Sequence, residues 1–160
     1  MQSNEQKAAF ANLHICQAYK GQEADFLERF FMKKDIEQRS DIELLINSFY
    51  DKVKEDTTIG YIFNDIAKVN WERHLPVMYD FWEGIILNKN NYSGNPMAVH
   101  AQLNALTPLK PEHFKQWLQL FTTTVNGLFE GKRSELAKQR AAGIAAVIQM
   151  KISNDPINIK

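Results

Sequence analysis

Two histidines are the residues of this sequence best suited to metal chemistry. His100 ends the turn-rich string NYSGNPMAVH, and His74 lies upstream of an aromatic-rich stretch that contains Phe81 and Trp82. Neutral imidazole is a common metal ligand and holds the iron of many haem proteins. A histidine that follows such a loop is therefore a candidate axial ligand of haem iron, and a second histidine can approach a flat ligand from its other face.

The same kinds of side chain also have ordinary structural interpretations. A single histidine on a helix is more often a surface or core residue than a metal ligand. Trp117 belongs to an apolar helical face and can simply fill a core, while Tyr50 can lie at the edge of a core with its hydroxyl in water. Residue types alone therefore leave the metal-binding and the structural interpretations open.

Several other chemistries lack the residues that they need. The sequence has no glycine-rich phosphate loop, no GxSxG nucleophile motif and no HExxH zinc motif. Cys16 is the single cysteine, which excludes an internal disulfide and leaves too few thiols for a structural zinc or iron–sulfur site. His14 is close to Cys16, but two ligands without companions make a poor metal site.

Charge and hydropathy patterning favour a cytoplasmic protein. Lysine plus arginine equals aspartate plus glutamate at 19 each, so no net field draws the chain to nucleic acid or to an anionic membrane. No apolar run approaches the roughly 20 residues of a membrane span, and the N-terminus lacks the pattern of a secretory signal. We therefore expect neither a nucleic-acid partner nor membrane insertion.

The length of the chain is that of a single domain. A sequence of 160 residues, 44% of them hydrophobic, can bury one core. Apolar residues are scattered over residues 1–39, so we expect a weakly specified N-terminal extension there, with an alternative start at Met32 as a hypothesis. We expect the domain itself to span residues 40–152 and a tail to span residues 153–160.

The first strong helix signal begins at Ser40. Ser40 and Glu43 have the spacing of a capping box, and an apolar stripe with helical spacing follows. Its members are Ile42, Leu45, Ile46, Phe49 and Val53. Thr57, Thr58 and Gly60 end this helix, and we interpret residues 61–63 as a corner between helices that is too brief to be a helix itself.

The two candidate ligands fall on the next two predicted helices. The second helix runs from about Asn70 to about Leu87 and carries His74; Pro76 inside it predicts either a kink or a later start. Residues 88–94 are rich in Asn, Lys and Gly and predict a loop. Asn95 followed by Pro96 has the N-cap and first-turn chemistry of a short helix, which carries His100.

Two more helices complete the pattern. Apolar residues recur at helical spacing between Phe114 and Leu128, with Gly131 closing the helix, and Ser134 opens a last helix with a stripe of small residues. No segment alternates as a half-buried strand does. The chain is therefore predicted to be all-α.

An ordered series of short segments resembles the truncated haemoglobins, specifically group III. The segments are FYDKV (49–53), IGYIF (59–63), WERH (71–74), DFWEGIIL (80–87), YSGNPMAVH (92–100), HFKQWLQLF (113–121) and QRAAGIA (139–145). They cover roughly residues 33–152 in the family's order, and the chain lacks the paired glycines that groups I and II place between helices. The resemblance implies a truncated globin fold, a two-over-two helical sandwich around a haem pocket.

Carried over residue by residue, the resemblance implies a set of roles at that pocket. His100 would be the proximal iron ligand, and Tyr50, His74 and Trp117 would be the polar distal, or catalytic, residues. Phe63 would pack on the haem from the corner. The remaining apolar wall would come from Met78, Phe81, Trp82 and Met97. Tyr61 departs from the family, since many relatives have proline there, and the N-terminal extension has no counterpart.

The resemblance also implies a function. The cofactor would be haem, most simply haem b, and the ligand would be oxygen or another diatomic gas, stabilised by the polar distal donors. We favour redox detoxification of nitric oxide or peroxide, with a separate reductase because no flavin or nicotinamide motif is present. The alternatives are gas binding or sensing without turnover and, third, a helical interaction domain without haem. Arg73, Lys89 and Tyr92 are candidate partners of the haem propionates.

Overall fold

Five α-helices and one π-helical turn make up the part of the chain that the computed structural model describes, residues 33–154. The helices are α2 (Arg39–Glu55), α3 (Trp71–Leu87), α4 (Pro96–Leu106), α5 (Pro111–Leu128) and α6 (Lys132–Asn154), and the turn is η1 (Ile62–Ile66). No strand occurs within the described range. None of these helices is long and apolar enough to cross a membrane. His14, Cys16 and the start proposed at Met32 lie outside the described residues.

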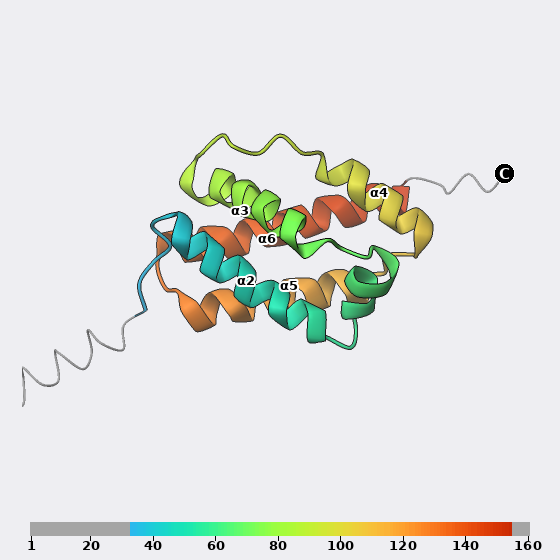
Figure 1. The fold of residues 1–160 in the computed structure, drawn as a ribbon, viewed down its shortest axis with the longest axis horizontal. Coiled ribbons are helices and arrows are strands. Elements are labelled where there is room, and N and C mark those ends of the chain that lie inside the picture. Colours follow the sequence, from blue (N-terminus) through green and yellow to red (C-terminus); the bar gives the residue numbers. More distant parts are fainter. Residues whose placement is uncertain (1–32, 155–160) are drawn as a thin grey trace, which may run out of the picture. The chain divides into compact units, whose positions relative to one another are not determined.

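The long helices form two packed pairs. Helix α2 packs on α3, and α5 packs on α6; α2 also lies against α5 and α3 against α6. The link between α5 and α6 is only three residues long, so these two helices must run antiparallel. Figure 1 shows that a long connection without helix separates α3 from α4. The predicted all-α, two-over-two arrangement is confirmed.

The core forms where these helices meet. All five residues of the predicted stripe on α2 are fully buried. Phe121 of α5 stacks on Trp82 of α3 with ring centroids 4.5 Å apart, and Phe49 of α2 meets Phe121 edge-on at 5.3 Å. Burial of each such side chain stabilises the fold by about 1.5–3 kcal/mol. Contacts between these rings therefore hold α2, α3 and α5 in place beside the predicted site.

The domain begins earlier than the sequence predicted. Helix α2 starts at Arg39, with Gln38 as N-cap, and the Asp41 carboxylate accepts hydrogen bonds from the backbone N–H groups of Glu37 and Gln38. The predicted capping box at Ser40 is therefore wrong by two residues. Ile36 is fully buried in the core, and the compact unit starts at Lys34 rather than at residue 40.

The start of α6 differs from its prediction for a related reason. The helix begins at Lys132, so Ser134 lies inside its first turn and does not open it. Asp35 caps this turn from a distant part of the chain: its carboxylate accepts hydrogen bonds from the backbone N–H groups of Arg133 and Ser134 and from the Ser134 hydroxyl. The capping residue precedes the helix by about a hundred positions, which no local pattern reveals.

The helices that carry the two histidines start as predicted. Asn70 accepts a hydrogen bond from the backbone N–H of Arg73 and caps α3, which runs through Pro76 without a break. Asn95 accepts from the backbone N–H of Ala98 at 3.1 Å and caps α4, whose first residue is Pro96. The later start considered for α3 is wrong, because a proline one turn into a helix costs a single backbone hydrogen bond.

The corner after α2 is more regular than predicted. Residues 62–66 form a π-helical turn, and the backbone N–H of Ala67 donates to the carbonyl of Ile62 at 2.8 Å. The interpretation of this segment as too brief for any helix is therefore wrong. Lys68 follows with a positive φ of 46°. This turn brings Phe63 to the side of Tyr50, with ring centroids 6.0 Å apart.

Candidate functional site

One large, mainly apolar cavity collects nearly all of the predicted site residues. Its volume is about 590 Å³, within the usual range for a cofactor pocket. Side chains from every described helix and from η1 line it. The predicted residues among them are Tyr50, Phe63, His74, Met78, Phe81, Trp82, His100 and Trp117.

Met97 is the predicted residue that does not line this cavity. It lines a separate, smaller groove with Ala101 of α4 and Ile148 of α6. Helical geometry explains the difference, because residues four apart share a face. Pro96, His100 and Leu103 face the cavity, whereas Met97 and Ala101 face α6. Its assignment to the pocket wall does not agree with this placement.

His100 is held in one tautomer by the first turn of its own helix. Its Nδ1 lies 2.7 Å from the carbonyl oxygen of Pro96, four residues earlier. A carbonyl oxygen only accepts hydrogen bonds, so Nδ1 must carry the proton and donate it. In the neutral ring the other nitrogen, Nε2, then keeps its lone pair. A backbone carbonyl that orients an imidazole in this way is the usual support of a metal-binding histidine.

Tyr50 and His74 form a polar pair inside the cavity. The Tyr50 hydroxyl oxygen lies 3.2 Å from Nε2 of His74, and their rings meet edge-on at 5.2 Å. Tyr50 is only 5% exposed. Burial raises the pKa of its hydroxyl, so the phenol keeps its proton. Burial, and then the charge of His100, lower the pKa of His74, which favours a neutral imidazole.

Trp117 lines the same cavity as this pair and packs on the core. Its ring stacks parallel to Phe121 at 5.6 Å and meets Phe49 edge-on at 5.4 Å. The indole N–H makes no hydrogen bond to any side chain or backbone group of residues 33–154. Indole can act only as a donor. Trp117 is thus both a core residue and a possible donor to a ligand in the cavity.

Some lining residues were not recognised in the sequence. His113 and Phe114 of α5 line the cavity, and the His113 ring meets Tyr61 edge-on at 6.2 Å. The spacing of His113 and Trp117, four residues apart on one helix, was the available signal. Of the candidate propionate partners, Arg73 and Tyr92 line the cavity and Lys89 does not. Lys68, which the sequence did not suggest, also lines it.

The cavity suits a flat, apolar ligand that carries a metal. Val77 and Val99 are 45% and 60% exposed although both line the cavity, so a ligand there would cover apolar surface that is otherwise open. The free Nε2 of His100 supplies one nitrogen ligand. Among residues 33–154, no group of three or more His, Cys, Asp or Glu side chains could hold a metal ion by itself. Arg73 and Lys68 supply cations for acidic groups on the ligand. These residues fit the haem implied by the sequence.

Comparison with known proteins points the same way. No family model matches the chain. A group 3 truncated hemoglobin from Campylobacter jejuni is 31% identical over 121 residues, which are 74% of this chain and 93% of that protein. A crystal structure of a group III truncated hemoglobin from Campylobacter jejuni superposes with a TM-score of 0.68 at 30% identity, and covers 78% of this chain and 98% of its own.

Proposed function

Because the chain belongs to the group III truncated haemoglobins, we propose that it binds haem b through Nε2 of His100 and a diatomic gas such as oxygen beside Tyr50, His74 and Trp117. The observation that carries this proposal is the orientation of His100. Its Nδ1–H donates to the Pro96 carbonyl at 2.7 Å, which leaves Nε2 free. The His100 side chain lines the same cavity as the Tyr50–His74 pair.

The bound haem would supply an iron atom, on which a diatomic ligand gains partial negative charge. The residues of the chain would then act on that ligand as donors. In the tautomer with a proton on Nε2, His74 donates to the Tyr50 oxygen, and the Tyr50 hydroxyl proton is left to point at the ligand. Trp117 offers a further N–H from α5. Preorganised donors of this kind act most strongly where water is excluded.

Apolar residues would keep water away from this polar corner. Phe63, Met78 and Phe81 line the cavity and belong to η1 and α3. Trp82, which lines the cavity beside these residues, is 2% exposed and is held in place by its stack on Phe121. A dry pocket strengthens each hydrogen bond to a charged or polarised ligand and slows loss of electrons to solvent-borne oxidants.

Slow ligand release favours redox chemistry over delivery. Two donors worth about 1–1.5 kcal/mol each would slow release on the order of 30- to 150-fold relative to an apolar pocket. We therefore propose detoxification of nitric oxide or peroxide in the cytoplasm, with electrons from a separate reductase. Gas binding or sensing without turnover is the second candidate, supported by the same donors. Membership of a haemoglobin family argues against the third candidate, a helical interaction domain without haem.

One comparison of rates tests the first candidate against the second. The protein is loaded with haem, reduced and oxygenated, and its consumption of nitric oxide is measured beside its oxygen dissociation rate under the same conditions. Detoxification requires that nitric oxide is consumed much faster than oxygen leaves, and that nitrate is the product. Equal rates would indicate that release precedes reaction, which would favour the binding or sensing role.

A further inference from the structure

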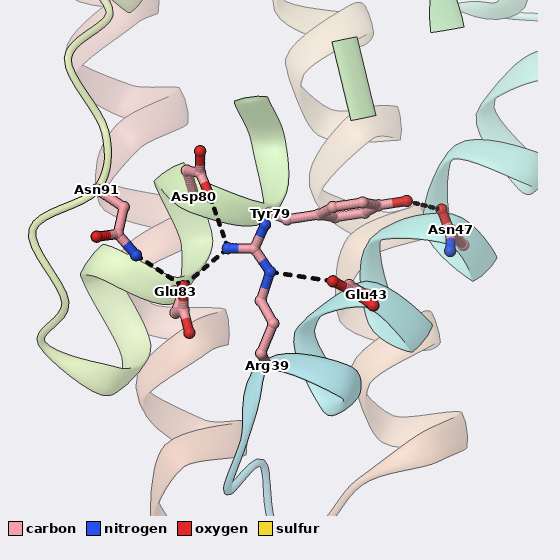
Figure 2. Close-up of polar contacts among 7 residues, drawn as sticks. All are labelled: Arg39, Glu43, Asn47, Tyr79, Asp80, Glu83 and Asn91. Atoms are coloured by element: carbon pink, nitrogen blue, oxygen red, sulfur yellow. Dashed lines mark hydrogen bonds and ion pairs between the residues drawn. The ribbon is translucent and has the colours of Figure 1, made fainter. Parts of the chain in front are cut away.

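A polar network outside the cavity joins α2 to α3 and to the loop that follows α3. Figure 2 shows Arg39 at its centre, on the first residue of α2. Its Nη1 donates to Oδ1 of Asp80 at 2.6 Å and to Oε2 of Glu83 at 2.8 Å. Its Nε donates to Glu43 at 3.1 Å, and the guanidinium lies over the Tyr79 ring. One cation thus meets three carboxylates.

Glu83 is the member of this network that burial makes dependent on Arg39. It is 8% exposed, and it follows Trp82, which lines the cavity, directly in sequence. Burial of a carboxylate costs free energy unless a cation and hydrogen-bond donors compensate it. Burial alone would lower the pKa of Arg39. The hydrogen bonds to Asp80, Glu43 and Glu83 outweigh burial and raise this pKa above its ordinary value, so the guanidinium keeps its charge.

The same oxygen of Glu83 holds the loop. Nδ2 of Asn91 donates to Oε2 of Glu83 at 3.2 Å, as Figure 2 shows. Within the described chain this is the one side-chain hydrogen bond that ties loop residues 89–94 to the rest of the protein. The next residue, Tyr92, lines the cavity and packs edge-on against Phe81 at 5.0 Å. Asn91 itself does not line the cavity.

This anchor lies shortly before the helix that carries His100. Four residues after Asn91, Asn95 caps α4 through the backbone N–H of Ala98. The next residue, Pro96, supplies the carbonyl that accepts from Nδ1 of His100. The loop has no regular secondary structure, so its attachment to α3 through Asn91, together with the packing of Tyr92 on Phe81, helps to place the first turn of α4.

We propose that Asn91, held by the Arg39–Glu83 ion pair, is a positioning residue that sets the first turn of α4 and thereby the approach of His100 to the haem iron. The inference rests on the proposed haem binding through His100. A polar network outside the cavity would thereby affect the position of His100. Without the anchor the loop samples more positions, His100 meets the iron less uniformly, and haem leaves faster.

The test compares Asn91→Ala with two matched controls in the haem-loaded full chain. Asn90→Ala truncates the neighbouring exposed amide, whose side chain makes no hydrogen bond within residues 33–154. Asp80→Asn weakens the ion pair to Arg39 but leaves Glu83 and Asn91 in place. Two quantities are measured for each variant: the rate of haem transfer to excess apomyoglobin, and the iron–histidine stretching band of the reduced, ligand-free protein by resonance Raman spectroscopy.

Asn91→Ala should raise the haem-loss rate about 3- to 10-fold, from the loss of one partly exposed hydrogen bond to a carboxylate, and should shift or broaden the iron–histidine band. Both controls should stay within about twofold of the unmodified protein, with the band unmoved. An unchanged rate or an unmoved band in Asn91→Ala, or the same changes in either control, would overturn the inference. A parent protein that takes up no haem would instead refute the proposed function.

Discussion

Replacing Tyr50 by phenylalanine removes one oxygen atom from the cavity and keeps the ring. The ring is held by edge contacts to Phe63 and His74 and a tilted contact to Trp71, all with centroids within 6.0 Å, and none of these involves the hydroxyl. The residue is 5% exposed, so the phenylalanine ring fills the same space. The substitution therefore isolates the hydrogen-bonding role of the hydroxyl from its packing.

The expected size of the effect follows from the loss of one neutral hydrogen bond to the ligand. Such a bond contributes about 1–1.5 kcal/mol, which corresponds to an oxygen dissociation rate about 5- to 13-fold higher. This is an upper bound, because His74 loses its 3.2 Å partner and its Nε2–H becomes available to the ligand. Tyr50→Phe combined with His74→Leu leaves no donor of this pair to take the place of the hydroxyl, so the double variant should show the full increase of about 5- to 13-fold.

The assay is stopped-flow displacement of oxygen from the reduced protein. Tyr79→Phe is the matched control, because its hydroxyl donates to Asn47 at 2.5 Å and does not line the cavity. The control should change the rate less than twofold. If Tyr50→Phe also stays within twofold, the hydroxyl is not a donor to the ligand. His74→Leu is measured alone as well; if the effect of the double variant equals the product of the two single effects, Tyr50 and His74 do not act as a coupled pair.

Two further predictions concern the distal indole and acid stability. Trp117→Phe should keep the stack on Phe121 but raise the oxygen dissociation rate about 5- to 13-fold, measured in the same displacement assay; an unchanged rate would remove the indole from the donor set. The pKa of Asp35 is lowered, because hydrogen bonds from Arg133 and Ser134 outweigh the opposing effect of burial. The stabilisation is fully present above the ordinary pKa of 3.8 and is lost as the pH falls below it. Asp35→Asn should therefore lose about 1 kcal/mol at pH 7, seen in urea unfolding, and should differ less from the parent near pH 3; an equal difference at both pH values would contradict the ionised cap.

The sequence predicted those parts of the fold that local chemistry specifies. Asn70 and Asn95 are short polar residues placed before apolar helical stretches, and both cap the helices that carry the two histidines. The stripe from Ile42 to Val53 is buried as its spacing indicates. The family resemblance rested on such segments in order, and it brought Tyr50, His74, His100 and Trp117 to one cavity.

What the sequence did not predict depends on contacts between distant residues. Asp35 caps α6 from about a hundred positions away, so the residues next to the start of that helix do not reveal its cap. Arg39 pairs with Glu83, 44 residues later, and no periodicity reports such a pair. Met97 and His100 share a short helix, but its rotation against α6 turns Met97 away from the cavity. That rotation is a property of packing, not of the local sequence.

The central claim is that Nε2 of His100 holds the iron of a bound haem. It is tested most directly by resonance Raman spectra of the reduced, ligand-free protein after titration with haemin, for the parent chain and for His100→Ala with and without added imidazole. The parent should take up one equivalent of haem and show an iron–histidine band; His100→Ala should lose the band and regain an iron–imidazole band when imidazole is supplied. A parent without haem uptake, or a band that survives in His100→Ala, would contradict the assignment.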